Sequence, residues 1–197
     1  MARRTTTGGQ NAEHGWGAVT AGLVDLCTPH VRLGSVLELD PGWLLARDIE
    51  ALVADLDNTL VPYGQREVDP GMADHVRSML AAGLRVVILS NAGVARSAPI
   101  AAALGVPFIA RAGKPALHAY ERALAKAGSA PGRAAGVGDQ LFRDVLGARR
   151  SGLLSVLVAP LSPRDFPGTT LLRGPERLLA AYLRRLGRWP EEGLPGV

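Results

Sequence analysis

The chain has 197 residues, of which 47% are hydrophobic and 20% charged, a composition that suits one globular domain with a full core. No apolar run approaches the roughly 20 residues that span a bilayer, and no apolar signal segment follows the N-terminal arginines, so we expect a soluble, cytoplasmic protein. The lone cysteine, Cys27, excludes an internal disulfide and a thiolate zinc cluster, while the net charge of +4 permits nucleic acid, anionic lipid or a phosphorylated substrate as partner.

Residues 1–17 are polar and predict a disordered N-terminal tail before a single domain over 18–187. Within that domain, short apolar runs alternate with helical patterns. Strands are predicted at 52–55, 85–90, 107–110, 135–138 and 153–158. Helices are predicted at 70–82, 94–104, 115–127, 142–150 and 176–187. Residues 188–197 contain Pro and Gly and are expected to form a flexible tail.

This alternation predicts an α/β fold in which a parallel five-stranded sheet carries helices on both faces. In such sheets the ligand crevice lies beyond the carboxyl ends of the strands. Candidate functional residues are therefore expected directly after the predicted strands.

The first predicted strand ends in two carboxylates one residue apart, Asp55 and Asp57, followed by the hydroxyl of Thr59. Side chains two residues apart on a strand point to the same face, where two carboxylates repel each other. A cation, a proton or phosphate chemistry would make the pair tolerable. The pair therefore indicates a metal-assisted phosphoryl site.

The second and third predicted strands end in other groups that can hold an anion. Ser90 and Asn91 precede a helix, whose N-terminal N–H groups favour anions, although serine is also a common helix cap. Lys114 follows the third strand and is one of only two lysines in an arginine-biased chain. The other, Lys126, lies near the end of a predicted helix and is interpreted as a solvated residue.

Two more carboxylates follow the fourth predicted strand, at Asp139 and Asp144. The glycines of this segment, Gly136 and Gly138, allow close approach of the backbone. An acid at a helix start, such as Asp144, can equally be a favourable cap. Asp139, at the end of a buried strand, is harder to explain without a function.

Taken in order, these residues resemble the four motifs of the haloacid dehalogenase (HAD) superfamily of phosphatases. Residues 55–59 are similar to the first motif, Ser90 to the second and Lys114 to the third, and Asp139 with Asp144 to the fourth. The YqeG-type branch of subclass III, a phosphatidylglycerophosphate phosphatase-like family, is similar over most of the chain.

Two departures from that branch adjoin the motifs. Arg143 stands where the family usually has Thr, and Ala92 stands where it usually has a second Asn. Neither replaces a motif residue, so the departures concern substrate contacts more than the chemistry.

The resemblance implies a three-layer, Rossmann-like HAD fold and a defined set of roles. Asp55 would be the nucleophile that forms an aspartyl-phosphate, and Asp57 would protonate the leaving alcohol and then activate water. Magnesium would be the cofactor, with ligands from Asp55, Asp57 through its backbone carbonyl, Asp139 and Asp144. The phosphoryl oxygens would be held by Thr59, Ser90, Asn91 and Lys114.

No cap domain is expected, because residues 57–90 and 90–114 are each consumed by one βα unit. An uncovered site suits a phosphate presented on something large, and a homo-oligomer could also supply a lid. The helix at 176–187 places apolar residues on one face, and arginines lie around that face. The apolar residues are Leu178, Leu179, Tyr182, Leu183 and Leu186. Such a helix can lie on an anionic membrane or pack on the sheet.

The resemblance favours phosphatidylglycerophosphate, met at the inner face of the membrane, as the substrate. The same chemistry on a soluble phosphate ester is the first alternative. The second alternative is a non-catalytic basic module that binds RNA or protein on the same scaffold. The intact motif residues and the 5% aromatic content, which is thin for base stacking, argue against a nucleic-acid partner.

Overall fold

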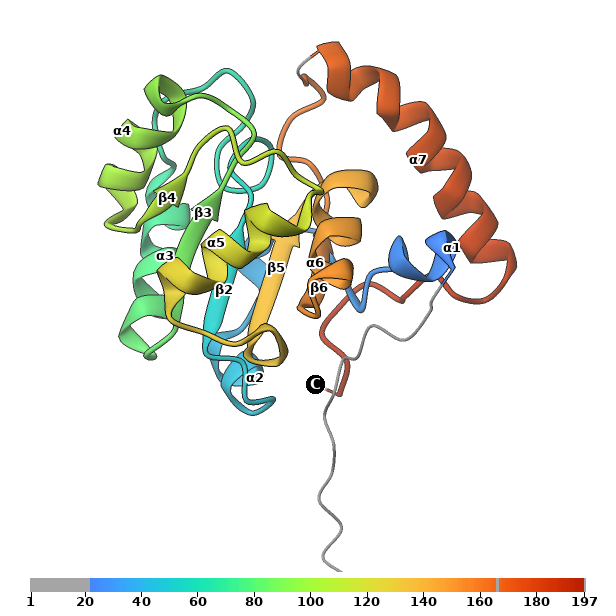
Figure 1. The fold of residues 1–197 in the computed structure, drawn as a ribbon, viewed down its shortest axis with the longest axis horizontal. Coiled ribbons are helices and arrows are strands. Elements are labelled where there is room, and N and C mark those ends of the chain that lie inside the picture. Colours follow the sequence, from blue (N-terminus) through green and yellow to red (C-terminus); the bar gives the residue numbers. More distant parts are fainter. Residues whose placement is uncertain (1–21, 166, 197) are drawn as a thin grey trace, which may run out of the picture.

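The computed structural model describes residues 22–165 and 167–196, so the predicted tail over 1–17 lies outside the described residues. Six parallel strands form one sheet in the order β1-β6-β5-β2-β3-β4 (Figure 1). The strands are β1 (Val31–Leu33), β2 (Ala51–Ala54), β3 (Arg85–Leu89), β4 (Phe108–Ile109), β5 (Ala134–Gly138) and β6 (Leu154–Val158).

The helices of the described residues alternate with these strands. They are α1 (Leu23–Leu26), α2 (Pro41–Leu45), α3 (Pro70–Ala81), α4 (Val94–Leu104), α5 (Leu117–Ala127), α6 (Leu146–Arg150) and α7 (Pro167–Arg185). Two 3₁₀ turns, η1 (Val36–Glu38) and η2 (Pro131–Arg133), and one π turn, η3 (Leu141–Val145), complete the chain path.

The sheet is covered on both faces, as predicted. Leu52 and Ala54 of β2 belong to the cluster that includes α3 and α4, whereas Ala51 and Val53 belong to the cluster that includes α5 and α6. Figure 1 shows α5 and α6 in front of the strands. Burial on both faces explains why the strands are continuous apolar runs, and the three-layer α/β architecture is confirmed.

The predicted number of five strands is wrong, because β1 adds a sixth strand at one edge of the sheet, beside β6. This strand has only three residues, with Arg32 between the buried Val31 and Leu33. A run this short carries little periodic signal.

The C-terminal part also differs from the prediction. Helix α7 begins at Pro167, nine residues before the predicted start at Glu176, although Gly168, Gly174 and Pro175 are poor helix formers. Contacts made by its side chains, such as the hydrogen bond from the Phe142 N–H group to Glu176 Oε1 (3.0 Å), fix it to the domain. Tertiary packing thus outweighs local helix propensity here.

Residues 188–196 are not the flexible tail that was predicted. Gly193 pairs with Arg32 of β1 in an antiparallel bridge, and its N–H group donates to the Arg32 carbonyl at 2.9 Å. The Pro195 carbonyl accepts hydrogen bonds from the side chains of Trp43 (3.0 Å) and Arg47 (2.9 Å). Gly193 and Pro195 therefore lie against β1 and α2.

The described residues also bear out the absence of a cap domain. Only α3 separates Asp57 from β3, and α4 with the short β4 separates Ser90 from Lys114. The carboxyl edge of the sheet is therefore left without an inserted domain above it.

Candidate active site

The sheet order brings three strand ends together. Because β2 lies between β3 and β5, Asp55 after β2 is flanked by Ser90 after β3 and Asp139 after β5. From β2 the chain builds one half of the sheet through β3 and β4, and it then returns to the other side of β2 to form β5 and β6. Ligand clefts in parallel sheets form at such a reversal of strand order, here between β2 and β5.

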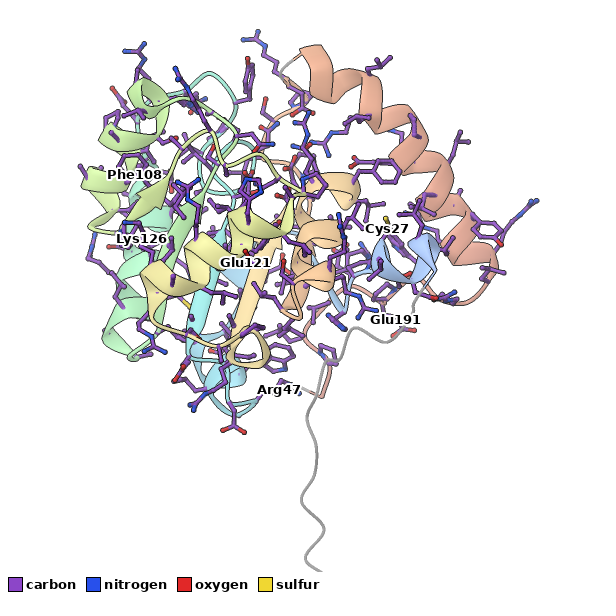
Figure 2. The ribbon with its side chains drawn as sticks, viewed as in Figure 1. Cys27, Arg47, Phe108, Glu121, Lys126 and Glu191 are labelled. Carbon is purple, nitrogen blue, oxygen red and sulfur yellow. The ribbon has the colours of Figure 1, made fainter. Side chains whose placement is uncertain are left out.

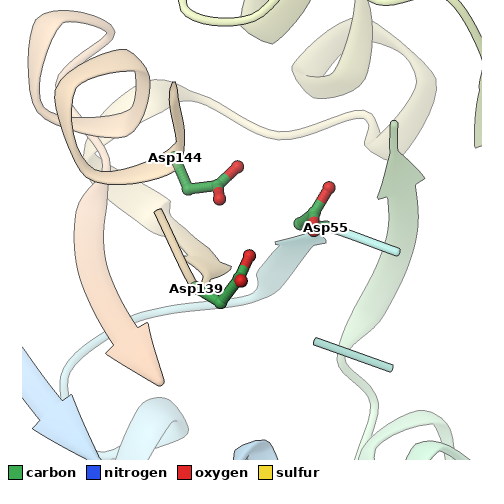
Figure 3. Close-up of side chains that lie close together, drawn as sticks. All are labelled: Asp55, Asp139 and Asp144. Carbon is green, nitrogen blue, oxygen red and sulfur yellow. The ribbon is translucent and has the colours of Figure 1, made fainter. Parts of the chain in front are cut away.

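Three carboxylates, of Asp55, Asp139 and Asp144, converge at this edge (Figure 3). One oxygen of each lies within 4.8 Å of the others, and all three residues are buried. Asp144 belongs to η3, the π turn that opens the helix predicted at 142–150. A Cβ atom on Gly138 would overlap the Asp144 carboxyl group, so the close approach predicted at this glycine is present.

Lys114 joins two of these carboxylates. Its Nζ lies 2.5 Å from Asp55 Oδ1 and 2.6 Å from Asp144 Oδ1. Burial disfavours the ammonium, but Asp144 and Asp55 outweigh burial and raise the pKa of Lys114 above its ordinary value. Lys126, in contrast, is exposed in the last turn of α5, as predicted (Figure 2).

The other predicted phosphate ligands surround the same point. Thr59 is buried and its hydroxyl donates to Asp55 Oδ2 at 3.3 Å. Ser90 is also buried, and its Oγ accepts a hydrogen bond from the Ala92 N–H group at 3.1 Å. Asn91 orients the loop that carries Lys114, because its Oδ1 accepts from the N–H groups of Gly113 (2.9 Å) and Lys114 (2.8 Å).

Arg173 of α7 is the main residue of this region that the sequence did not indicate. Its guanidinium pairs with the Asp139 carboxylate and donates to the Asp139 backbone carbonyl at 2.8 Å. It also donates to Asp165 Oδ2 at 2.8 Å and lies 3.5 Å from Glu176 Oε2. Helix α7 is thereby tied to the end of β5.

A second connection runs from Asp165 to the first motif. The Asn58 side chain donates to Asp165 Oδ1 at 2.7 Å and to the Arg164 carbonyl at 2.8 Å. Its own Oδ1 accepts from the Tyr63 N–H group at 3.0 Å. Asn58 has φ +64°, a left-handed conformation that asparagine adopts more readily than most residues. The turn after Asp57 is therefore fixed to the segment that precedes α7.

Burial controls the protonation of the carboxylates. Burial, followed by the negative charges of Asp55 and Asp144, raises the pKa of Asp139 to about 8, against the opposing effect of Arg173. Burial likewise raises the pKa of Asp55 to about 6, although Lys114 acts to lower it. The positive charges of Lys114 and Arg173 are therefore too few to balance the three clustered carboxylates.

The same cluster has the composition of a divalent-cation site. Carboxylate oxygens are the ligands that hard cations such as Mg²⁺ prefer. Asp139 Oδ1 is buried without a hydrogen-bond partner among the described residues, although its carboxylate pairs with Arg173 through Oδ2. A bound cation would give that oxygen a partner, so the carboxylates of Asp55, Asp139 and Asp144 are suitable metal ligands.

The Asp57 carboxylate is not one of the three clustered carboxylates and pairs instead with Arg96. Its Oδ1 accepts hydrogen bonds from Arg96 Nε (3.1 Å) and Nη2 (2.7 Å), and Arg96 also donates to the Pro62 carbonyl at 3.3 Å. The structure thus separates the two motif carboxylates, with Asp55 paired to Lys114 and Asp57 paired to Arg96.

A cleft of about 570 Å³ opens above these residues. It is lined by Asp55, Asp57, Tyr63, Gly64, Arg66, Ser90, Asn91, Ala92, Gly93, Arg96, Lys114, Gln140, Arg143 and Asp165. The volume lies within the range of pockets that bind small molecules. One open cleft therefore contains both motif carboxylates and the buried lysine.

Sequence reasoning missed Arg96, Asp165 and Arg173. Arg96 is one of many arginines and lies three residues into a helix pattern, so nothing in its neighbourhood distinguishes it. Asp165 and Arg173 lie in a stretch rich in Pro and Gly to which no helix or strand was assigned.

The chain is similar to one protein family and to individual phosphatases. The HAD-hydrolase-like family model matches residues 111–160. The probable phosphatase YqeG of Bacillus subtilis is 33% identical over 165 residues, which cover 83% of this chain and 96% of that protein. Phosphatidylglycerophosphate phosphatase 1 of Chlamydomonas reinhardtii is 30% identical over 86% of this chain and 66% of its own length.

Among solved structures, a HAD phosphatase from Thermococcus onnurineus has a TM-score of 0.43 and 21% identity, with 51% of each chain covered.

The metal-free protein is expected to lose stability as the pH rises from about 4 to about 8. The folded-state pKa of Asp139 is about 8, whereas an unfolded aspartate has a pKa of about 3.9. Between these two pKa values the folded state holds a proton on Asp139 that the unfolded state has released. The stabilisation by this proton is complete below the unfolded-state pKa and is lost above the folded-state pKa. The measurement is the melting temperature in EDTA as a function of pH.

Asp139→Asn should reduce the slope of this pH profile, above all between about pH 6 and 8, because the amide does not titrate and the pKa of Asp55 is about 6. Asp74→Asn, at an exposed position of α3, is the matched control and should keep the wild-type slope. An Asp139→Asn protein with the wild-type slope would contradict the assignment.

Proposed function

Since this chain is a phosphatase of the YqeG family within the HAD superfamily, we propose that it hydrolyses phosphate monoesters with Mg²⁺ through an aspartyl-phosphate intermediate. The observation that carries the proposal is the buried Asp55 held between Lys114 and Thr59 at the floor of the cleft. Membership of a phosphatase family and the intact motif residues favour hydrolysis over the alternative of a non-catalytic RNA- or protein-binding module.

In the first step, an Asp55 carboxylate oxygen attacks phosphorus, and the bond from phosphorus to the leaving oxygen breaks. Asp57, which lines the same cleft, donates a proton to that oxygen. In the second step, Asp57 takes a proton from water as the water attacks the phosphorus of the aspartyl-phosphate. Inorganic phosphate leaves and Asp55 is regenerated.

The chain supplies the electrostatics of both steps. Lys114 and Ser90 line the cleft and would bind phosphoryl oxygens, and Asn91 fixes the loop of Lys114. Thr59, buried beside Asp55, is proposed to contribute its hydroxyl group. Arg96 holds the Asp57 carboxylate toward the cleft. Mg²⁺, held by Asp55, Asp139, Asp144 and the Asp57 carbonyl, would offset the charge of carboxylates and phosphate.

The proposed physiological substrate is phosphatidylglycerophosphate, which the name of the Chlamydomonas relative suggests. The absence of a cap over the described cleft supports a substrate presented at a surface. Within residues 22–165 and 167–196, no helix combines the length and apolar character that a membrane span requires. We therefore propose a cytoplasmic protein that binds peripherally at the inner face of the membrane.

Helix α7 offers a surface for that contact. The predicted apolar face divides in two, because Leu179, Ala180 and Leu183 pack against the domain. A second stripe faces outward, with Leu178 74% exposed and three further apolar residues, Leu171, Tyr182 and Leu186. Exposed arginines lie beside the stripe, at Arg177, Arg184, Arg185 and Arg188. This pattern is typical of a helix that lies on anionic lipid.

Asp55→Asn should reduce phosphate release from a monoester by at least about a thousandfold, because an amide is a poor nucleophile for phosphorus. The measurement is phosphate release with Mg²⁺, beside Asp48→Asn as the matched control at an exposed position before β2. Wild-type rates in Asp55→Asn would exclude the covalent route.

Arg173→Ala should weaken binding of a divalent cation by roughly tenfold, because Arg173 orients the Asp139 carboxylate. The free Mn²⁺ signal in electron paramagnetic resonance measures binding without catalysis. Arg177→Ala, one turn along α7 and exposed, should bind Mn²⁺ as the wild type does. Tighter Mn²⁺ binding by Arg173→Ala would instead show that the arginine competes with the metal.

The protein should sediment with vesicles that contain phosphatidylglycerol, and added salt should weaken this binding. Leu178→Gln should reduce the bound fraction, whereas Leu37→Gln, at an equally apolar exposed site on η1, should not. Equal binding of the two variants, or no binding of the wild type, would contradict the proposed surface.

A further inference from the structure

Gln140 is a buried residue of the cleft whose side chain carries a polar atom without a partner. It follows Asp139 directly and precedes η3, and only 8% of its surface is exposed. The residue contributes to the lining of the cleft. Its Oε1 is buried and has no hydrogen-bond partner among the described residues. Because buried polar atoms of native proteins normally have a partner, we expect Oε1 to gain one when the cleft is occupied.

The backbone of Gln140 is fixed by the start of η3. Its N–H group donates to Asp144 Oδ2 at 3.1 Å, and its carbonyl accepts from the N–H groups of Asp144 (3.0 Å) and Val145 (3.1 Å). Asp144 in turn pairs with Lys114 through Oδ1. The position of Gln140 is therefore tied to one of the carboxylates that are suited to bind a cation.

Gln140 and Asp139 line different cavities. Gln140 has an extended conformation, with φ −121° and ψ 127°, in which neighbouring side chains alternate between two sides of the chain. In agreement, Asp139 lines a second cavity of about 610 Å³ beside α7, whereas Gln140 lines the cleft that contains Asp55. This arrangement disfavours direct binding of both side chains to one cation.

Water in the cleft has access to the cation site through Asp55. Of the three clustered carboxylates, of Asp55, Asp139 and Asp144, only that of Asp55 belongs to a residue of the cleft lining. Mg²⁺ binds oxygen ligands in octahedral geometry and usually keeps several water molecules. Those water molecules would face the cleft, whose wall includes Gln140.

The partner of Gln140 Oε1 must be a hydrogen-bond donor, because a carbonyl oxygen only accepts. This condition excludes the oxygens of a phosphate dianion, which accept as well. The ammonium group of Lys114 already pairs with Asp55 and Asp144. Water bound to a divalent cation is a strong donor, because the ion withdraws charge from the water oxygen. Such a water molecule therefore has the chemistry that this buried acceptor requires.

We propose that Gln140 is a positioning residue for the metal site, whose Oε1 accepts a hydrogen bond from a water molecule bound to the divalent cation. The proposal rests on the metal-dependent phosphatase function and adds to it a residue that is not itself a ligand. By holding this water molecule, Gln140 fixes the coordination of the cation on the side of the cleft. Removing an outer partner of this kind typically lowers metal affinity by about ten- to a hundredfold.

The test measures Mn²⁺ binding through the free Mn²⁺ signal in electron paramagnetic resonance, without substrate or turnover. Gln140→Met keeps a side chain of similar length but removes the acceptor, and should weaken binding by about tenfold. Gln140→Glu keeps an acceptor at this position and should bind Mn²⁺ at least as tightly as the wild type. Gln65→Met, at an exposed position of the loop before α3, is the matched control and should bind as the wild type does.

Thermal melting in EDTA separates a positioning role from a purely structural one. Gln140→Met should melt at or above the wild-type temperature, because the metal-free protein has no hydrogen bond at Oε1 to lose. A lower melting temperature together with weaker Mn²⁺ binding would show that Gln140 supports the fold, and would overturn the proposal.

The binding data also distinguish failure of this proposal from failure of the proposed function. Wild-type affinity in Gln140→Met would overturn the positioning role and leave the metal-dependent function standing. An equal loss of affinity in Gln140→Met and Gln140→Glu would show an effect of packing and would likewise overturn the role. Absence of Mn²⁺ binding by the wild-type protein would contradict both the positioning role and the metal-dependent function.

Discussion

The active site depends on holding three buried carboxylates close together without unfolding the chain. Taking a carboxylate out of water costs several kcal/mol, and a like charge nearby adds to that cost. Asp55, Asp139 and Asp144 face two fixed cations, Lys114 and Arg173. The charge that is still missing can come from a proton on Asp139 or from a bound cation, so protonation and metal binding are linked at one oxygen cluster.

The two fixed cations come from opposite halves of the sheet. Lys114 follows β4 at one edge, and Arg173 belongs to α7, which follows β6 near the other edge. Asp165 and Asn58 connect the start of α7 to the turn after β2. The site is therefore complete only when α7 is packed in place, so substitutions in this helix can alter metal binding from a distance.

Local sequence patterns were sufficient to locate the strand-end residues. Asp55, Ser90, Lys114 and Asp139 each follow a short apolar run, and parallel topology brings such ends together. Arg173 could not be found in this way, because the Gly and Pro residues around it are unfavourable for a helix and its partner in the carboxylate cluster, Asp139, lies 34 residues away in the sequence. The order of residues also could not divide the apolar face of α7, since the packing of this helix against the domain decides that Leu183 is buried and Leu178 exposed.

The C-terminal segment has a consequence for how copies of the protein meet. An edge strand with free N–H and C=O groups is a template for pairing with another chain. Gly193 occupies that position on β1, and Glu192 pairs with Arg32 beside it. At the other edge, β4 has only two residues. Both sides of the sheet are thus poor templates for intermolecular strand addition, which protects the protein against aggregation through its edges.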